Sequence, residues 1–229
     1  PFSAARDLLY CAESQARTGD PNSLVQSVHL TADWPKTHSH YEDAQEILKD
    51  ASEQILVLAN RWAQEGQLAK ATKLAGEIPL NTPLRKPAQA VIYEWRQDWE
   101  TGKVVEQDID QALETQDWDA ARMHLGKLQT IKSEYWSSLR FPYWQHRFEI
   151  EQQAWNQLQT AQNLAQAPSA QDWANAIALA RKIDLRSHAW IQAEAEVDEW
   201  SQKLLRVAFQ EWEAGNQRSE EHTSELQSL

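Results

Sequence analysis

The chain contains an internal repeat, which constrains its fold more than any other feature of the sequence. The segment Leu68–Leu80 (LAKATKLAGEIPL) recurs as Trp173–Leu185 (WANAIALARKIDL), and the match continues without a gap to Trp95 and Trp200. The matching positions are apolar and lie three or four residues apart, which is the spacing of one helix face. Self-similarity of this kind at a fixed offset is typical of stacked helical-repeat arrays.

Four units can be superimposed on this pattern, each with a short helix, a polar or proline-containing turn and a longer helix. They cover roughly residues 22–65, 66–115, 116–168 and 169–214, within an array of residues 1–217, and a partial unit over residues 1–20 precedes them. We therefore predict an all-α fold, in which tandem helical hairpins stack as an α-α superhelix, or solenoid. We expect the chain to be a fragment of a longer array, and the last long helix to end near Ala214–Gln217.

The third unit is irregular, because additional residues around Arg140–Arg147 precede a long helix that we expect to resume at Phe148. Insertions in repeat proteins map to loops on one face, often the binding face. Trp, Tyr and Arg dominate the binding energy of interfaces. Candidate partner-binding residues are therefore Arg140, Tyr143, Trp144 and Arg147. Two alternatives remain open: aromatic side chains that fill a groove between units, and a stacking platform for single-stranded nucleic acid.

Tryptophan occurs 12 times, and its positions favour packing over recognition. A large aromatic residue that takes the place of Leu in a repeat fills volume between helices. We predict this role for seven of them: Trp62, Trp95, Trp99, Trp118, Trp155, Trp173 and Trp200. The other five are less constrained: Trp34, Trp136, Trp144, Trp190 and Trp212. The single cysteine, Cys11, is expected on the buried face of the first helix.

The charge balance narrows the classes of partner. Lys and Arg total 22 and Asp and Glu total 34, which gives a net charge of -12. This balance argues against binding to duplex nucleic acid and to anionic membrane surfaces. No run of residues approaches the length of a membrane span, and we expect a cytoplasmic protein. Because the chain does not begin with Met, we expect a preceding segment, which could carry a signal or an anchor.

Residues 218–229 are interpreted as an artefactual tail outside the array. The sequence from Arg218 to Ser228 (RSEEHTSELQS) resembles the translation of a common short-read sequencing adapter. Segments of this origin are not part of the natural fold. We therefore expect the tail to contribute nothing to stability.

No pattern of residues indicates catalysis. There is no Gly-rich phosphate loop, no pair of cysteines and no strand-turn-helix nucleophile elbow. His38 and His40 offer two imidazoles, but no matching pair of metal ligands stands out elsewhere. We predict no catalytic, cofactor-binding or metal-binding residue, and hence no enzyme.

The repeated pattern also carries a family resemblance. W/L-x-x-A-x-x-L-A-x-x-I occurs at Trp173–Ile183 and Leu68–Ile78, and an Ala-x-x-x-Ile-x-x-Trp follows in the long helix. Together with the turns, these segments resemble α-helical repeat proteins of cyanobacteria, which are broadly similar to tetratricopeptide arrays. The resemblance covers nearly all of residues 24–212. It implies an interaction module and supplies no catalytic residue.

The predicted function is therefore a non-enzymatic protein–protein interaction scaffold, with a protein partner of unknown identity. The alternative is a structural, coiled-coil-like segment of a cell-envelope or chromosome-associated protein. That alternative predicts self-association through the apolar stripes of the long helices. A third class, an enzyme with a site between helices, has no residue pattern in its favour.

Overall fold

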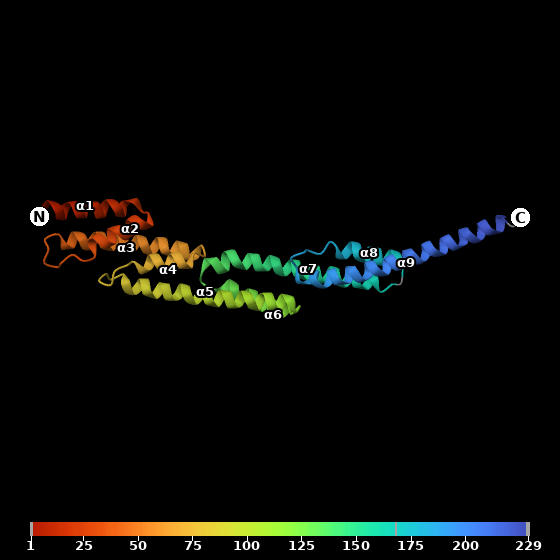
Figure 1. The fold of residues 1–229 in the computed structure, drawn as a ribbon. Helices are drawn as coiled ribbons and strands as arrows, with labels where there is room; N and C mark the ends of the chain where they lie inside the picture. The colour runs from red at the N-terminus through yellow and green to blue at the C-terminus, as the bar shows by residue number, and fades with distance from the viewer. Residues whose placement is uncertain (1, 168, 228–229) are drawn as a thin grey trace. The chain divides into compact units, whose positions relative to one another are not determined.

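The described part of the chain consists of helices joined by short turns (Figure 1). The computed structural model describes the backbone of residues 2–167 and 169–227, and the side chains of residues 4–167 and 169–215. No strand is found in these ranges, which confirms the all-α prediction. The helices are α1 (Phe2–Thr18), α2 (Pro21–Thr31), α3 (Tyr41–Gln64), α4 (Leu68–Gly76), α5 (Arg85–Glu114), α6 (Trp118–Thr130), the π-helix η1 (Tyr135–Arg140), α7 (Phe141–Ala165), α8 (Ala170–Ala180) and α9 (His188–Gln227).

Short and long helices alternate along the chain, and successive helices pack in pairs, as in a helical-repeat array. The chain divides into two compact units. The first unit comprises Pro1–Asp108 and Met123–Pro142, and the second comprises Ile109–Arg122 and Tyr143–Leu229. Each unit has its own buried apolar cluster.

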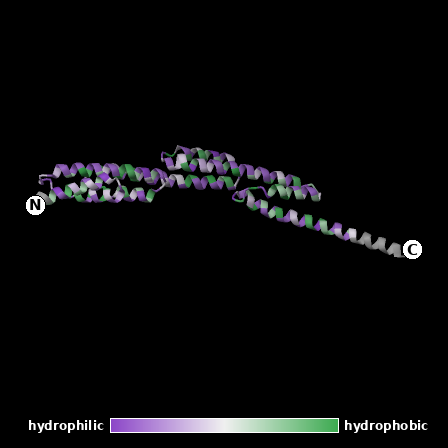
Figure 2. Cartoon of the chain, turned by 90° about the horizontal axis from the view of Figure 1, so that it is seen from above, coloured by the Kyte–Doolittle hydropathy of each residue, from purple (hydrophilic) through white to green (hydrophobic). Residues whose placement is uncertain are grey.

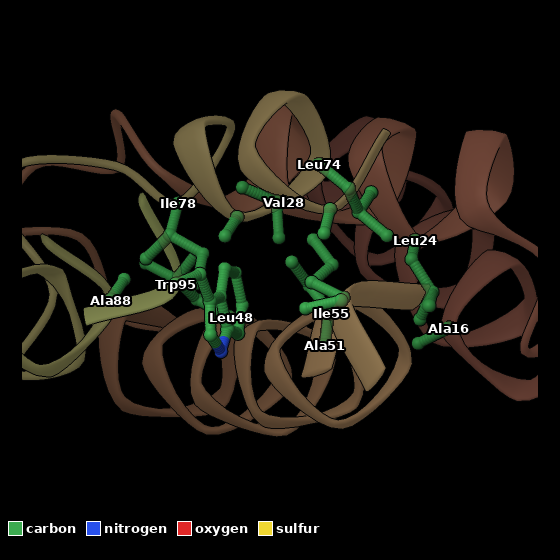
Figure 3. Packing of buried hydrophobic residues seen from close by; sticks show 14 residues of the cluster. Ala16, Leu24, Val28, Leu48, Ala51, Ile55, Leu74, Ile78, Ala88 and Trp95 are labelled. Carbon is green, nitrogen blue, oxygen red and sulfur yellow. The ribbon is translucent and has the colours of Figure 1, made fainter. Parts of the chain in front are cut away.

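The core of the first unit is built where α2 and α4 pack on α3. Leu24 and Val28 of α2 meet Leu48 and Ile55 of α3, and all four side chains are almost completely buried (Figure 3). On α4, the buried face is made of small and branched residues at helical spacing: Ala71, Leu74 and Ala75. Hydrophobic and hydrophilic residues are interspersed along the coloured helices (Figure 2), as expected where one face of a helix is buried and the other is exposed.

The core of the second unit lies between α7, α8 and the first half of α9. Its fully buried residues are Ala154, Leu158 and Ala161 of α7, Ala176 and Ala180 of α8, and Ala189 and Ala193 of α9. Trp200 packs at the edge of this cluster and is 5% exposed, and its repeat equivalent Trp95 is 8% exposed in the first unit. The predicted equivalence of these two tryptophans as core residues is confirmed. The other five tryptophans assigned to packing are partly buried: Trp62, Trp99, Trp118, Trp155 and Trp173.

Three long helices end in the same way. Gly19, Gly66 and Gln116 have φ angles of +69°, +81° and +59°, the left-handed conformation that commonly terminates a helix. Long helices thus end at Gln64 and Glu114, close to the unit boundaries predicted after residues 65 and 115. Pro168, the last residue of the predicted third unit, lies outside the described residues.

The predicted end of the last long helix is wrong, because α9 continues through Gly215 to Gln227. A glycine inside a helix costs only about 1 kcal/mol relative to alanine. No proline follows that would stop the helix. Residues 218–227 thus belong to α9, while the side chains of residues 216–229 lie outside the described ones, so their lack of contribution to stability remains a prediction.

The expectation for Cys11 is also wrong, because its side chain is exposed. Ala12 and Ala16 occupy the buried positions of α1. These two residues lie four apart and so share one face of the helix, whereas Cys11 is rotated away from it. The buried face of α1 is lined by small residues where α2 packs closely against it.

Candidate functional site

The irregular segment of the third unit is helical and does not form the loop expected from the sequence. Tyr135–Arg140 forms η1, and α7 begins at Phe141, so the long helix starts before Phe148. Pro142 does not break the helix, because η1 runs directly into α7 and the Phe141 N–H donates to the Trp136 carbonyl, five residues earlier. The proline ring crowds the carbonyl one turn earlier, which favours the wider π-helical turn that precedes it.

Trp136 is the buried centre of an aromatic cluster in the first unit. Its side chain is 2% exposed, and its ring lies 5.3 Å from that of Trp99, between centroids. Tyr135 stacks on Trp99 with the centroids 5.2 Å apart. A Cβ atom on Gly102 of α5 would collide with the Trp136 ring, and a Cβ atom on Gly66 would collide with Tyr135. The two glycines therefore form the socket into which η1 inserts its aromatic side chains.

The four predicted partner-binding residues are divided between the two units. Arg140 belongs to the first unit, where it forms an ion pair with Glu106 of α5. Tyr143, Trp144 and Arg147 belong to the second unit. Trp144 is buried and lies edge-on to Tyr143, which is 49% exposed. Of the four side chains, Tyr143 is the one with substantial exposed surface, and a role of the set in partner binding stays a prediction.

Arg147 is part of a buried polar network that fixes the start of α9. Its guanidinium donates to the Glu151 carboxylate at 2.9 Å and to the backbone carbonyl of Arg186 at 3.0 Å. The same carboxylate, which is 0% exposed, accepts the backbone N–H of His188 at 3.0 and 3.1 Å. Buried charges are tolerated when they are paired and hydrogen-bonded in this way. Glu151 therefore caps α9 from α7.

An open groove in the first unit offers a more accessible surface. It has a volume of about 620 Å³ and lies between the second half of α3, the middle of α5 and the end of α6. Buried side chains form its apolar floor: Trp95, Val105 and Ile131. Exposed polar and aromatic side chains form its rim: Asn60, Tyr93, Glu94, Thr101, Lys127 and Lys132. An apolar floor with a polar rim is the usual arrangement of a protein-binding surface.

The rim of this groove, which we call the α3/α5/α6 groove, carries charges of both signs. Glu94 and Asp98 lie one turn apart on α5, and Lys127 and Lys132 line the groove from α6 and the residues after it. Burial raises the pKa of the Asp98 carboxyl above its ordinary value, Lys132 opposes this rise, and Glu94 adds to it. Asp98 is therefore a carboxylate that the folded state holds at a cost in free energy.

The histidine pair at the start of α3 is engaged locally. His40 pairs with Asp43 at 3.0 Å, and the Nδ1 atom of His38 accepts the backbone N–H of His40 at 3.2 Å. Within residues 4–167 and 169–215, no group of three or more His, Cys, Asp or Glu side chains is placed to hold a metal ion. Over the same ranges, none of the helices combines the length and the apolar character that crossing a membrane requires.

Comparison with protein-family models, with curated proteins and with solved structures gives no match for this chain. No relative therefore supplies a site residue. The fold and the groove together define an all-α protein with helices packed in successive pairs and an open, partly apolar surface between them.

The sequence interpretation missed the groove residues of α5. Tyr93, Glu94 and Asp98 have the spacing of an ordinary solvated helix face. One feature could have drawn attention to them: Asp98 sits between Trp95 and Trp99, so a carboxylate borders the apolar stripe of the helix.

Proposed function

We propose that this chain is a non-enzymatic protein–protein interaction module that binds a segment of a partner protein in the α3/α5/α6 groove. The observation that carries the proposal is the open groove itself, whose buried apolar floor of Trp95, Val105 and Ile131 is bordered by the Asp98 carboxyl. Burial raises the pKa of this carboxyl, so that its charge opposes folding. Natural proteins retain destabilising polar groups mainly where function requires them. A partner that brings a cationic group to Asp98 recovers this cost on binding.

The other groove residues support a peptide ligand. Trp95, Val105 and Ile131 provide an apolar floor, on which a partner side chain can be desolvated. Tyr93 is exposed at the rim and is of a residue type enriched at binding hot spots. Acidic residues on α5 face the groove together with lysines on the α6 side, which suits a segment that carries both signs of charge.

Site-specific photocrosslinking tests the proposal. The photoreactive amino acid p-benzoylphenylalanine replaces Tyr93 in the groove or, as a control, Lys49 on α3, and each full chain is irradiated in an extract of the source organism. Both original residues are exposed, so that random collisions label both positions. We expect one defined product from position 93 alone. Adding Asp98→Ala should reduce this product at least about tenfold, the loss expected for one charge-assisted contact of ~1.5 kcal/mol or more.

Equal labelling from positions 93 and 49 would refute the groove as a binding site. So would a product from position 93 that persists unchanged when Asp98 is replaced. Circular dichroism of each variant verifies that the helices are intact, which separates loss of binding from loss of fold.

A second candidate function is the structural, coiled-coil-like segment, because the second half of α9 exposes apolar residues such as Phe209 and Trp212. This function requires self-association through α9. Sedimentation equilibrium of the full chain at micromolar concentration distinguishes the two: a dimer that dissociates with Trp212→Glu favours the structural segment, and a monomer favours the interaction module.

A further inference from the structure

The second half of α9 presents an unpartnered apolar strip. Leu205, Ala208, Phe209 and Trp212, which we call the α9 strip, line a shallow hollow of about 290 Å³. All four side chains are exposed, and α9 extends beyond α8 here with no other described element of its own unit beside it (Figure 1). The strip continues along α9 from the contact that α9 makes with α8, where Val197 and Trp200 are buried. The packing surface of the helix is therefore longer than the part that its own unit covers.

The position of the strip matches faces that are covered elsewhere in the chain. The same spacing separates Ala12 of α1 from Gly19 after its end, Ala59 of α3 from Gly66 after its end, and Ala208 from Gly215 within α9. Ala59 and Ala63 of α3 are buried in one cluster with residues of α4, and Ala16 of α1 is buried against Leu24 of α2. In both cases the occupant is the short helix that follows. In α9 the positions equivalent to Ala59 and Ala63 are held by Ala208 and Trp212, and both are exposed.

The short helices show what chemistry suits such a face. The buried face of α4 consists of Ala71, Leu74 and Ala75, so its backbone can approach the long helix closely. Because α9 carries Trp212 where α3 carries the smaller Ala63, the helix that packs on α9 needs alanine-sized residues opposite the indole. The apolar residues of this docking helix must recur every three or four positions, so that they form one face of the helix.

The charges beside the strip favour an occupant with basic flanks. Glu211 and Glu213 are exposed next to Trp212 on α9. On α4, the exposed side includes Lys70 and Lys73. A helix of this type therefore complements α9 in charge as well as in shape, and such complementarity selects among partners.

We propose that the α9 strip is a docking site for a short amphipathic helix of another protein chain, with an Ala/Leu face and basic flanks, which packs on α9 as α4 packs on α3. The site lies apart from the α3/α5/α6 groove in sequence and uses none of its residues. Occupancy of the strip therefore neither requires nor excludes the proposed function of the groove.

A peptide with the sequence of residues 66–80 of this chain is a suitable probe, because it contains the α4 face and both lysines. Its fluorescein-labelled form is titrated with the full-length chain, and fluorescence anisotropy is recorded. We expect saturable binding to the wild-type chain. Ala208→Glu and Trp212→Glu should each weaken it at least about tenfold, a change of ~1.4 kcal/mol. Ile191→Glu is the matched control, because Ile191 is an exposed apolar residue of the same helix outside the strip, and it should bind like the wild type.

Each remaining outcome overturns the proposal. The proposal is overturned if the peptide shows no saturable binding up to millimolar chain concentration. It is also overturned if Ala208→Glu and Trp212→Glu leave the binding unchanged, since the peptide would then dock elsewhere. A chain dimer that Trp212→Glu dissociates, without peptide binding, would assign the strip to a second copy of this chain. A control peptide with Leu74→Glu should not bind, and equal binding of the control peptide would likewise contradict a docking mode like that of α4.

Discussion

Two regions of this chain are rich in aromatic residues, and they differ in what lies opposite them. In the segment of residues 135–147, Trp136 is 2% exposed, whereas Phe209 and Trp212 of the α9 strip are each 64% exposed. Trp136 faces Gly102, where the missing side chain leaves room for an indole ring. The α9 strip has no such counterpart within the described part of its unit. Aromatic composition alone therefore does not distinguish a packing element from a binding surface. The difference depends on whether an opposing helix leaves room for the aromatic ring.

Removal of the two indoles gives the largest expected contrast between these regions. Trp136→Ala should reduce the free energy of unfolding by about 3–5 kcal/mol, because it leaves a cavity in the aromatic cluster. Trp212→Ala should change it by less than about 0.5 kcal/mol, because the side chain is exposed. Urea unfolding followed by circular dichroism measures both. Equal losses for the two variants would contradict the comparison.

Arg147 provides the next test, because the sequence suggested a partner-binding role and the structure shows it inside a polar network. Arg147→Ala leaves the Glu151 carboxylate buried without its cation, which should cost about 3 kcal/mol or more. Lys203→Ala removes an exposed ion pair with Glu199 and should cost no more than about 0.5 kcal/mol. Chemical unfolding measures the difference. An Arg147→Ala protein as stable as Lys203→Ala would show that the arginine does not hold the start of α9.

Gly102 tests the socket itself. Gly102→Ala introduces a Cβ atom that collides with the Trp136 ring, and overpacking of this kind should destabilise the protein by about 1–3 kcal/mol. Gly126 in α6 is the control, because a Cβ atom there meets no other atom within 4 Å. Gly126→Ala should raise stability by up to about 1 kcal/mol, the helix propensity difference. A stabilising effect of Gly102→Ala would mean that the indole is not seated against α5.

The smallest expected effect is the acid response of the turn before α9. Hydrogen bonds from Arg186 lower the pKa of Asp184 to about 2. A carboxyl whose pKa is lower in the folded state stabilises the protein above its unfolded pKa, and this contribution is lost as the pH falls. Asp184→Asn should therefore be slightly less stable than the wild type at pH 5, with a difference that shrinks toward pH 2. Unfolding curves at pH 5, 3 and 2 measure it. A difference that stays constant with pH would exclude this ionisation as its cause.

Periodicity predicted the helices of this chain well because it reports burial within each helix. The repeat alignment placed Trp95 and Trp200 at equivalent positions, and both are buried. Turn residues marked the ends of α3 and α5, since Gly66 and Gln116 adopt the left-handed conformation there. The helix end predicted near Gly215 was wrong, because a single glycine without a following proline does not stop a helix.

Contacts between helices were harder to predict, since they depend on which faces meet in three dimensions. The sequence predicted a loop for the additional residues near Arg140, whereas they form the end of η1 and the beginning of α7. Gly102 was the available indication, because a glycine within a strongly helical pattern commonly has a packing reason. The groove around Asp98 was harder to recognise, because its walls come from three helices that are distant in sequence. Its indication in the sequence was a carboxylate between Trp95 and Trp99 on the apolar stripe of α5.

The cap that Glu151 provides for α9 also bears on the order in which the chain folds during synthesis. The Glu151 carboxylate accepts a hydrogen bond from the backbone N–H of His188, which lies 37 residues later in the chain. The acceptor therefore leaves the ribosome first. Forming the first turn of a helix is the costly step, since several dihedral angles are fixed for one hydrogen bond. Once α7 has formed, its Glu151 carboxylate can accept a hydrogen bond from the first turn of the nascent α9. Nucleation of α9 is therefore coupled to completion of α7.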